Sequence, residues 1–95
     1  MLRIEIVDAT SECFTSGFKR LPSEIKAEAA QALSDLLRTP HLGRLRIEKL
    51  SGYKKPGIYT IHITRNHSHK ASFEINGTTA IMRKVGTHKE IDRAP

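Results

Sequence analysis

The sequence predicts an α+β domain in which a hairpin of two helices packs on one face of a mostly antiparallel sheet of four to five strands. Apolar residues recur at helical spacing in the first half of the chain and alternate with polar residues in the second half. The later strands follow one another through short turns, which favours antiparallel pairing. The chain has 95 residues and no internal repeat or linker, so residues 1–95 are expected to form a single domain.

The first half of the chain is expected to form one strand and two consecutive helices. The strand is residues 2–7, whose inward side chains would be Leu2, Ile4 and Ile6. The first helix presents one apolar face, made of Phe14, Phe18 and Leu21. The second helix follows Pro22, with Ser23 as its N-cap. It presents a longer apolar stripe, made of Ile25, Ala29, Ala32, Leu33, Leu36 and Leu37.

The second half of the chain is expected to form strands separated by short loops. Alternating segments are residues 45–50, 58–64 and 69–75. Their inward side chains would include Tyr59, Ile61, Ile63, Ala71, Phe73 and Ile75. Asn76-Gly77 predicts a tight hairpin into a last strand at residues 78–85. That last strand carries apolar residues on both faces, so its pattern leaves open which face is inward.

The face of the sheet turned away from the helices is expected to be open and polar. It would collect the outward side chains of the middle strands, which are Thr60, His62, Lys70 and Ser72. Arg83 joins this face if the last strand turns Ala80 and Met82 inward. His88 then lies at the end of the last strand, within reach of the same face.

Composition favours a polyanionic partner. Sixteen Lys and Arg residues against ten Asp and Glu residues give a net charge of +6, which suits nucleic acid, an anionic membrane surface or an acidic protein. A membrane surface is disfavoured because no segment pairs a long apolar face with a basic one. The one cysteine excludes an intrachain disulfide, and no apolar run approaches the roughly 20 residues of a spanning helix. These features predict a soluble cytoplasmic protein.

Two histidines beside several cations suit the cleavage of RNA without a metal. In that reaction the RNA's own 2′-hydroxyl attacks the phosphate, so the site needs a base for its proton and an acid for the leaving 5′-oxygen. Histidine can serve in either role near neutral pH. Lysine and arginine would stabilise the phosphate as its negative charge grows in the transition state.

Several stretches resemble the RelE/ParE superfamily of bacterial toxins. "FKRLP" at residues 18–22 is similar to the family pattern F-x-K-x-L-P, and "KLSG" followed by "IYTIHI" is similar to its central strands. "VGTHKEI" at residues 85–91 resembles the G-T-H-x-E-I ending of YafQ-like members. The resemblance covers almost the whole chain, and "GTHKEI" is its most specific piece. Among the subgroups, the RelE-like and YafQ-like mRNA interferases are closest in motif.

The resemblance implies a toxin of a type II toxin–antitoxin pair that cuts mRNA at the ribosomal A site without a metal. His88 matches the catalytic general acid or base of YafQ-like members, and His62 matches a second family histidine. Lys70 stands where RelE-like members carry an arginine. Lys70 and Arg83 would stabilise the phosphate. The residues expected to hold RNA or ribosomal RNA backbone are Lys54, Lys55, Lys84 and Lys89.

The resemblance also implies partners and a setting. We expect a cognate antitoxin that covers part of the polar face, mRNA on the ribosome as substrate, no cofactor and no metal. The free toxin is expected to be a monomer in the cytoplasm of a bacterium or an archaeon. Two departures bear on activity. Asp92 stands where relatives carry an aromatic residue that stacks on a base, and lysine at position 70 lacks the two-pronged geometry of arginine.

Other interpretations stay open at this point. The chain could be a ParE-like toxin that acts on DNA gyrase, or a degenerate basic RNA-binding member. His88 could be an ordinary strand-end residue, and His62 a solvated one. The stretch "HITRNHSH" could present His67 and His69 to a metal, although a solvated turn fits it better because no Cys or Asp accompanies them.

Overall fold

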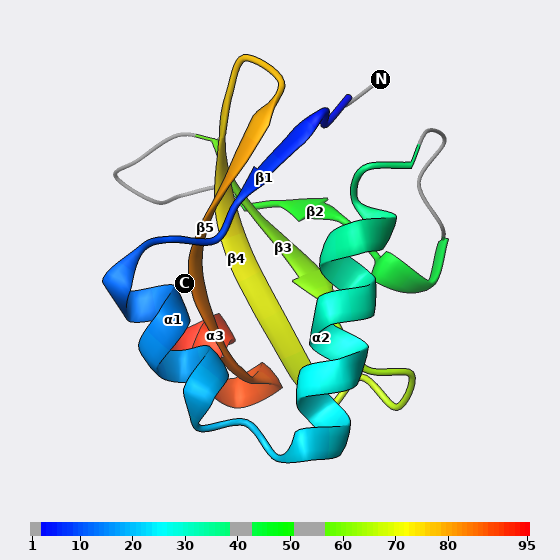
Figure 1. Cartoon of the computed structure of the whole chain (residues 1–95), viewed down its shortest axis with the longest axis vertical. Coiled ribbons are helices and arrows are strands. Elements are labelled where there is room, and N and C mark those ends of the chain that lie inside the picture. The colour runs from blue at the N-terminus through cyan, green and yellow to red at the C-terminus, as the bar shows by residue number, and fades with distance from the viewer. Residues whose placement is uncertain (1–2, 39–42, 51–56) are drawn as a thin grey trace.

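The computed structural model describes residues 3–38, 43–50 and 57–95. Its strands are β1 (Ile6–Asp8), β2 (Glu48–Lys49), β3 (Ile58–His62), β4 (His69–Asn76) and β5 (Thr79–Thr87). Its helices are α1 (Glu12–Lys19), α2 (Ser23–Asp35) and α3 (His88–Arg93), with a 3₁₀ turn at Gly43–Leu45. The strands form one sheet in the order β1-β5-β4-β3-β2 (Figure 1). β1 runs parallel to β5 and the other neighbours are antiparallel, which confirms the predicted α+β class.

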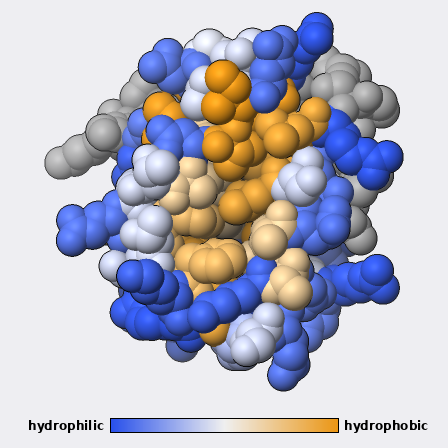
Figure 2. Space-filling view, viewed as in Figure 1, coloured by the Kyte–Doolittle hydropathy of each residue, from blue (hydrophilic) through white to orange (hydrophobic). Residues whose placement is uncertain are grey.

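The helices α1 and α2 pack on the same face of the sheet, as predicted. The core between them joins Phe14 of α1 and Ala32 of α2 to buried side chains of the middle strands, which are Ile61, Ala71, Phe73 and Met82. Burying a large apolar side chain of this kind contributes about 1.5–3 kcal/mol. Figure 2 shows further apolar side chains gathered along the middle of this face, flanked by hydrophilic ones.

Two features of the first half differ from the prediction. Ile6 is 57% exposed rather than inward. The N–H groups of Glu5 and Ile6 both donate to the carbonyl oxygen of Thr78. Two residues of the first strand therefore share one residue of β5, and the inward and outward positions of that strand shift by one residue. Leu2 lies outside the described residues.

The second helix also differs in its ends. It begins at Ser23 with Pro22 as N-cap, so Ser23 is the first helical residue rather than the cap. It ends at Asp35, and Leu37 beyond it is 45% exposed, so Leu37 does not belong to the apolar stripe. Leu37 continues the helical spacing of apolar residues in the sequence, but the helix has already ended before it.

The middle strands follow the predicted alternation. Ile61, Ala71 and Phe73 are buried against the helices. The β4–β5 hairpin turns at Gly77, whose φ of +63° is one that glycine adopts at little cost. β2 is shorter than the expected strand at residues 45–50, since it consists of Glu48 and Lys49.

A β-bulge in β5 explains why that strand carries apolar residues on both faces. Ser72 is opposite Lys84 and Phe73 is opposite Met82, so Arg83 is an extra residue in the ladder. Met82 before the bulge and Val85 after it are both buried on the helix side. One inserted residue therefore moves the inward positions from even to odd numbers.

The face of the sheet turned away from the helices is polar, as predicted, but the prediction that it is open is wrong for the middle strands. Its four outward side chains, Thr60, His62, Lys70 and Ser72, are all buried. The chain turns back after β5 into α3, which the sequence reasoning did not predict, and α3 contacts β4 and β5 (Figure 1). No helix in the described ranges is long and apolar enough to cross a membrane.

Candidate functional site

The pairing of β3 with β4 brings the first two site residues together. His62 lies opposite Lys70 in the antiparallel register, and Lys70 lies opposite Gly86 of β5. His88 comes two residues after Gly86 and is the first residue of α3. The start of the helix turns its ring back over the sheet, so the ring centroids of His88 and His62 are 5.3 Å apart.

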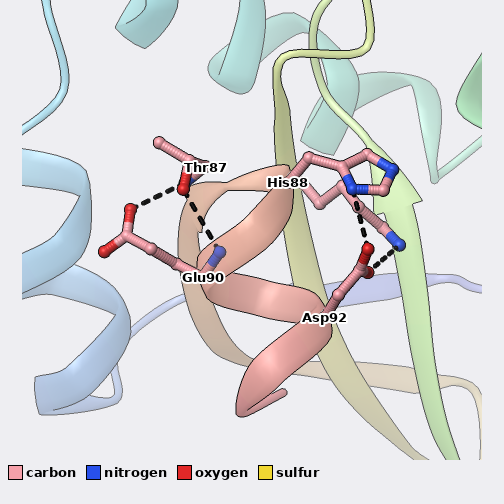
Figure 3. Close-up of polar contacts among 5 residues, drawn as sticks. Thr87, His88, Glu90 and Asp92 are labelled. Atoms are coloured by element: carbon pink, nitrogen blue, oxygen red, sulfur yellow. Dashed lines mark hydrogen bonds and ion pairs between the residues drawn. The ribbon is translucent and has the colours of Figure 1, made fainter.

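A capping box fixes where α3 begins. Thr87 Oγ1 accepts a hydrogen bond from the Glu90 N–H, and a Glu90 carboxylate oxygen accepts one from the Thr87 N–H (Figure 3). In addition, the His88 N–H donates to the carbonyl oxygen of Ser68 at 2.9 Å, which ties the helix start to the turn before β4. His88 is therefore held at two places: it directly follows β5, as expected, and it also begins a helix that was not predicted.

Asp92 joins His88 to Lys70. Lys70 Nζ donates to Asp92 Oδ1 at 2.7 Å, and His88 Nδ1 lies 2.7 Å from Asp92 Oδ2 (Figure 3). His88 and Asp92 are four residues apart on α3 and so share one face of the helix. The side chain of Lys70 is 5% exposed, whereas those of His88 and Asp92 are 44% and 48% exposed. The cluster thus has a buried ammonium and a reachable imidazole linked by one carboxylate.

The electrostatics of the cluster favour a neutral His62 and an ionised Asp92. Burial lowers the pKa of His62, and the nearby His67, Lys70 and His88 lower it further. The hydrogen bond from Lys70 lowers the pKa of Asp92. At neutral pH one imidazole is therefore uncharged beside a carboxylate that carries its full charge.

A third imidazole belongs to the cluster. The ring of His67 meets that of His62 edge-on, with centroids 4.6 Å apart. His67 has a φ of +60°, which is uncommon for a residue with a side chain and is often found at functional sites. The turn expected at residues 62–69 is present, and His67 lies half-buried in it against His62. The side chain of His69 does not join the cluster, and its Nδ1 lies 2.7 Å from Ser68 Oγ.

Three buried polar atoms beside the cluster have no hydrogen-bond partner within the described parts of the chain. They are Thr60 Oγ1, His62 Nδ1 and Ser72 Oγ. Thr60 and Ser72 are opposite each other in the ladder, one row away from His62 and Lys70. Buried polar atoms without partners are rare in folded proteins and are often found where a site has a task other than stability. In the same ranges no group of three or more metal-ligating side chains is arranged to hold a metal ion.

The other predicted residues either do not contact the cluster or lie outside the described residues. Arg83 pairs with Glu74, and its Nε donates to the carbonyl oxygen of Pro95. Lys84 lines a groove between α1, β5 and α3 together with Arg20 and Arg93. Lys89 is exposed on α3. Lys54 and Lys55 lie outside the described residues.

The sequence reasoning named Asp92 and His67 but assigned neither of them to the catalytic site. "THKE" at residues 87–90 matches the capping-box pattern, in which Ser or Thr is followed three residues later by Glu or Gln. That signal places a helix start at Thr87 and therefore puts His88 and Asp92 on one helical face. The position of His67 follows from the turn geometry, for which the sequence carries no comparable signal.

Comparisons with known proteins give matches in structure. A comparison of the sequence with protein-family profiles finds no match, and neither does a comparison with curated proteins. A chain of the RelB–RelE antitoxin–toxin complex of Methanococcus jannaschii is 23% identical with a TM-score of 0.67, over 95% of this chain and 98% of that one. A chain of the E. coli DinJ–YafQ toxin–antitoxin complex is 14% identical with a TM-score of 0.69, over 96% and 98%.

A third similar structure is the YoeB dimer of Staphylococcus aureus. It is 16% identical with a TM-score of 0.62, over 93% of this chain and 99% of that one. All three alignments run nearly end to end. The RelE-like fold that the sequence predicted is therefore confirmed.

Proposed function

We propose that this chain is the toxin of a type II toxin–antitoxin pair and that it cleaves mRNA on the ribosome without a metal. The fold that it shares with chains of two toxin–antitoxin complexes supports the first part. The second part depends on one observation: His88, reachable from solvent, lies against both a second imidazole and the Lys70–Asp92 pair.

In this proposal the two imidazoles divide the proton transfers. His62 is kept neutral by burial and by its cationic neighbours, so it is suited to accept the proton of the 2′-hydroxyl. His88 would deliver a proton to the leaving 5′-oxygen from Nε2, because its Nδ1 lies against the carboxylate of Asp92. Centroids 5.3 Å apart allow the two rings to contact one phosphodiester group.

Positive side chains would hold the RNA. The net charge of +6 favours binding to the phosphate backbone, and such binding weakens as salt concentration rises. Lys70 is the cation at the cluster, and Lys54, Lys55, Lys84 and Lys89 would contact backbone further along the strand. Arg83 would contribute only after exchanging Glu74 for a phosphate, because that carboxylate pairs with it in the protein alone.

A cognate antitoxin would cover apolar surface as well as the catalytic residues. Apolar side chains gather along the middle of the face that carries α1 and α2 (Figure 2). Val7, Tyr59 and Ile75 are half-buried there against the core. We therefore expect an antitoxin segment with apolar side chains on this face and acidic ones toward the basic surface of the toxin.

The test is to express the chain from a tightly repressed promoter and to map new mRNA 5′ ends. His88→Ala removes the proposed acid. His69→Gln is the matched control, because His69 lines a pocket with Gly17 and Leu21 on the helix side of the sheet. We expect growth arrest with new cuts in translated regions for the wild type and for His69→Gln. We expect neither for His88→Ala, since proton transfer contributes about 10²–10⁴ in rate.

Two other outcomes would separate the alternatives. Arrest without new cuts, unchanged in His88→Ala, would point to DNA gyrase or another target. Cuts in naked RNA at the same rate as on ribosomes would refute the ribosome dependence and leave the nuclease assignment in place.

A further inference from the structure

We propose that Asp92 is a positioning residue, which sets the orientation and tautomer of His88 and fixes Lys70 beside it. This inference rests on the proposed nuclease function. The resemblance to YafQ-like toxins implies an aromatic residue at position 92, where this chain has an aspartate. The geometry assigns the aspartate a task of its own in this chain.

The two oxygens of Asp92 serve two different donors. Oδ1 accepts from Lys70 Nζ of β4, and Oδ2 faces His88 Nδ1 of α3, both at 2.7 Å. Because the donors come from different elements, Asp92 connects the last helix to the middle of the sheet. A carboxylate is the side chain that offers an acceptor to each of two such donors.

The contact with Asp92 decides which nitrogen of His88 carries a proton. A carboxylate oxygen accepts hydrogen bonds, so His88 Nδ1 must be the donor when it lies against Oδ2. Nε2 is then the nitrogen that exchanges a proton with the substrate. An imidazole that is 44% exposed would otherwise sample both tautomers and several orientations.

The burial of Lys70 distinguishes the contact between Asp92 and His88 from an ordinary exposed ion pair. Exposed ion pairs contribute about 0–1 kcal/mol and restrain their side chains weakly. The Lys70 side chain is 5% exposed, and a buried ammonium requires a close anion. Lys70 therefore holds Asp92 in one place, and Asp92 in turn holds the ring of His88.

The test is Asp92→Asn, which keeps the shape of the side chain but replaces one acceptor with an amide donor. With Lys70 still requiring the remaining oxygen, the amide NH₂ faces His88 and favours the tautomer with Nδ1 unprotonated. Proton-detected ¹⁵N spectra at about pH 8, where an ordinary imidazole is mostly neutral, report the tautomer directly. We expect Nδ1–H in the wild type and Nε2–H in Asp92→Asn.

Cleavage is measured on the same variants. We expect kcat to fall about 10- to 100-fold in Asp92→Asn with KM nearly unchanged, because a misplaced proton loses part of the 10²–10⁴ that such catalysis provides. Asp92→Glu restores two carboxylate oxygens and should recover most of the rate. Asp8→Asn is the matched control, since Asp8 lies on β1 and hydrogen-bonds Thr10.

An unchanged tautomer in Asp92→Asn would overturn the inference whatever the rate. A changed tautomer with an unchanged kcat would overturn the positioning role. A wild type without cleavage would refute the proposed function, and the spectra would then decide by themselves whether Asp92 controls the His88 ring.

Discussion

At the centre of the β-sheet both faces are buried, but they carry opposite kinds of side chain. On the helix side, Ile61 and Phe73 are 0% exposed within the apolar core. On the other side, Thr60 and Ser72 are 1% and 0% exposed, and their hydroxyl oxygens have no hydrogen-bond partner among the described residues. Phe73 and Ser72 are neighbours in β4, so this contrast arises within one peptide unit.

The apolar face of the sheet stabilises the fold, whereas the polar face carries the residues of the proposed site. The apolar face gains free energy from every side chain that it removes from water. The polar face loses free energy for each buried hydroxyl or ammonium that lacks a full set of partners. Placing His62, Lys70 and Ser72 there therefore costs stability, which fits the catalytic role proposed for this face.

Phe73→Ala should have the largest effect on stability. It removes a fully buried ring that stacks on Tyr59, with centroids 5.5 Å apart. We expect the free energy of unfolding to fall by about 3–5 kcal/mol, which is a large part of the 5–15 kcal/mol of a typical domain. Urea denaturation followed by circular dichroism measures it, and a loss below about 1 kcal/mol would refute the core assignment of this face.

Lys70→Met should affect activity far more than stability. Methionine keeps most of the apolar stem of Lys70, and Asp92 is exposed enough for water to solvate its charge. We expect unfolding to change by no more than about 1 kcal/mol, while cleavage falls about 100-fold because the phosphate loses its cation. A variant that unfolds as it loses activity would make Lys70 a structural residue.

Ser72→Ala should stabilise the protein slightly. The substitution removes a buried hydroxyl that has no partner among the described residues, and it leaves almost no cavity. We expect a gain of about 1 kcal/mol in the free energy of unfolding, because the cost of desolvating that oxygen disappears. A loss of similar size would mean that Ser72 Oγ is hydrogen-bonded in the folded protein. Measured beside Phe73→Ala, it compares the two faces at adjacent positions.

The smallest effect concerns the pH dependence of stability. Burial lowers the pKa of His62 below the ordinary 6.5, so the unfolded chain takes up this proton first as pH falls. The stability linked to His62 is complete above about pH 6.5 and is lost as pH falls through the lowered pKa. His62→Gln should flatten the decline in unfolding free energy as pH falls below about 6.5.

The local pattern of the sequence determined most of the elements and the face of each side chain in the middle strands. Alternation in β3 and β4 placed His62 and Lys70 on one face because the strand repeat is two residues. Helical spacing and the Asn-Gly turn likewise depend on a few neighbouring residues. Such features can be deduced because the physics that produces them acts over a few residues.

The tertiary structure decided what joins the site together. The bulge at Arg83 changes which residues of β5 are inward, and it exists only when β4 lies beside that strand. Asp92 meets Lys70 across 22 residues of sequence because α3 folds back on the sheet. The same fold-back places a carboxylate beside the buried ammonium of Lys70. These contacts depend on how distant segments pack to bury surface, which no short window of the sequence determines.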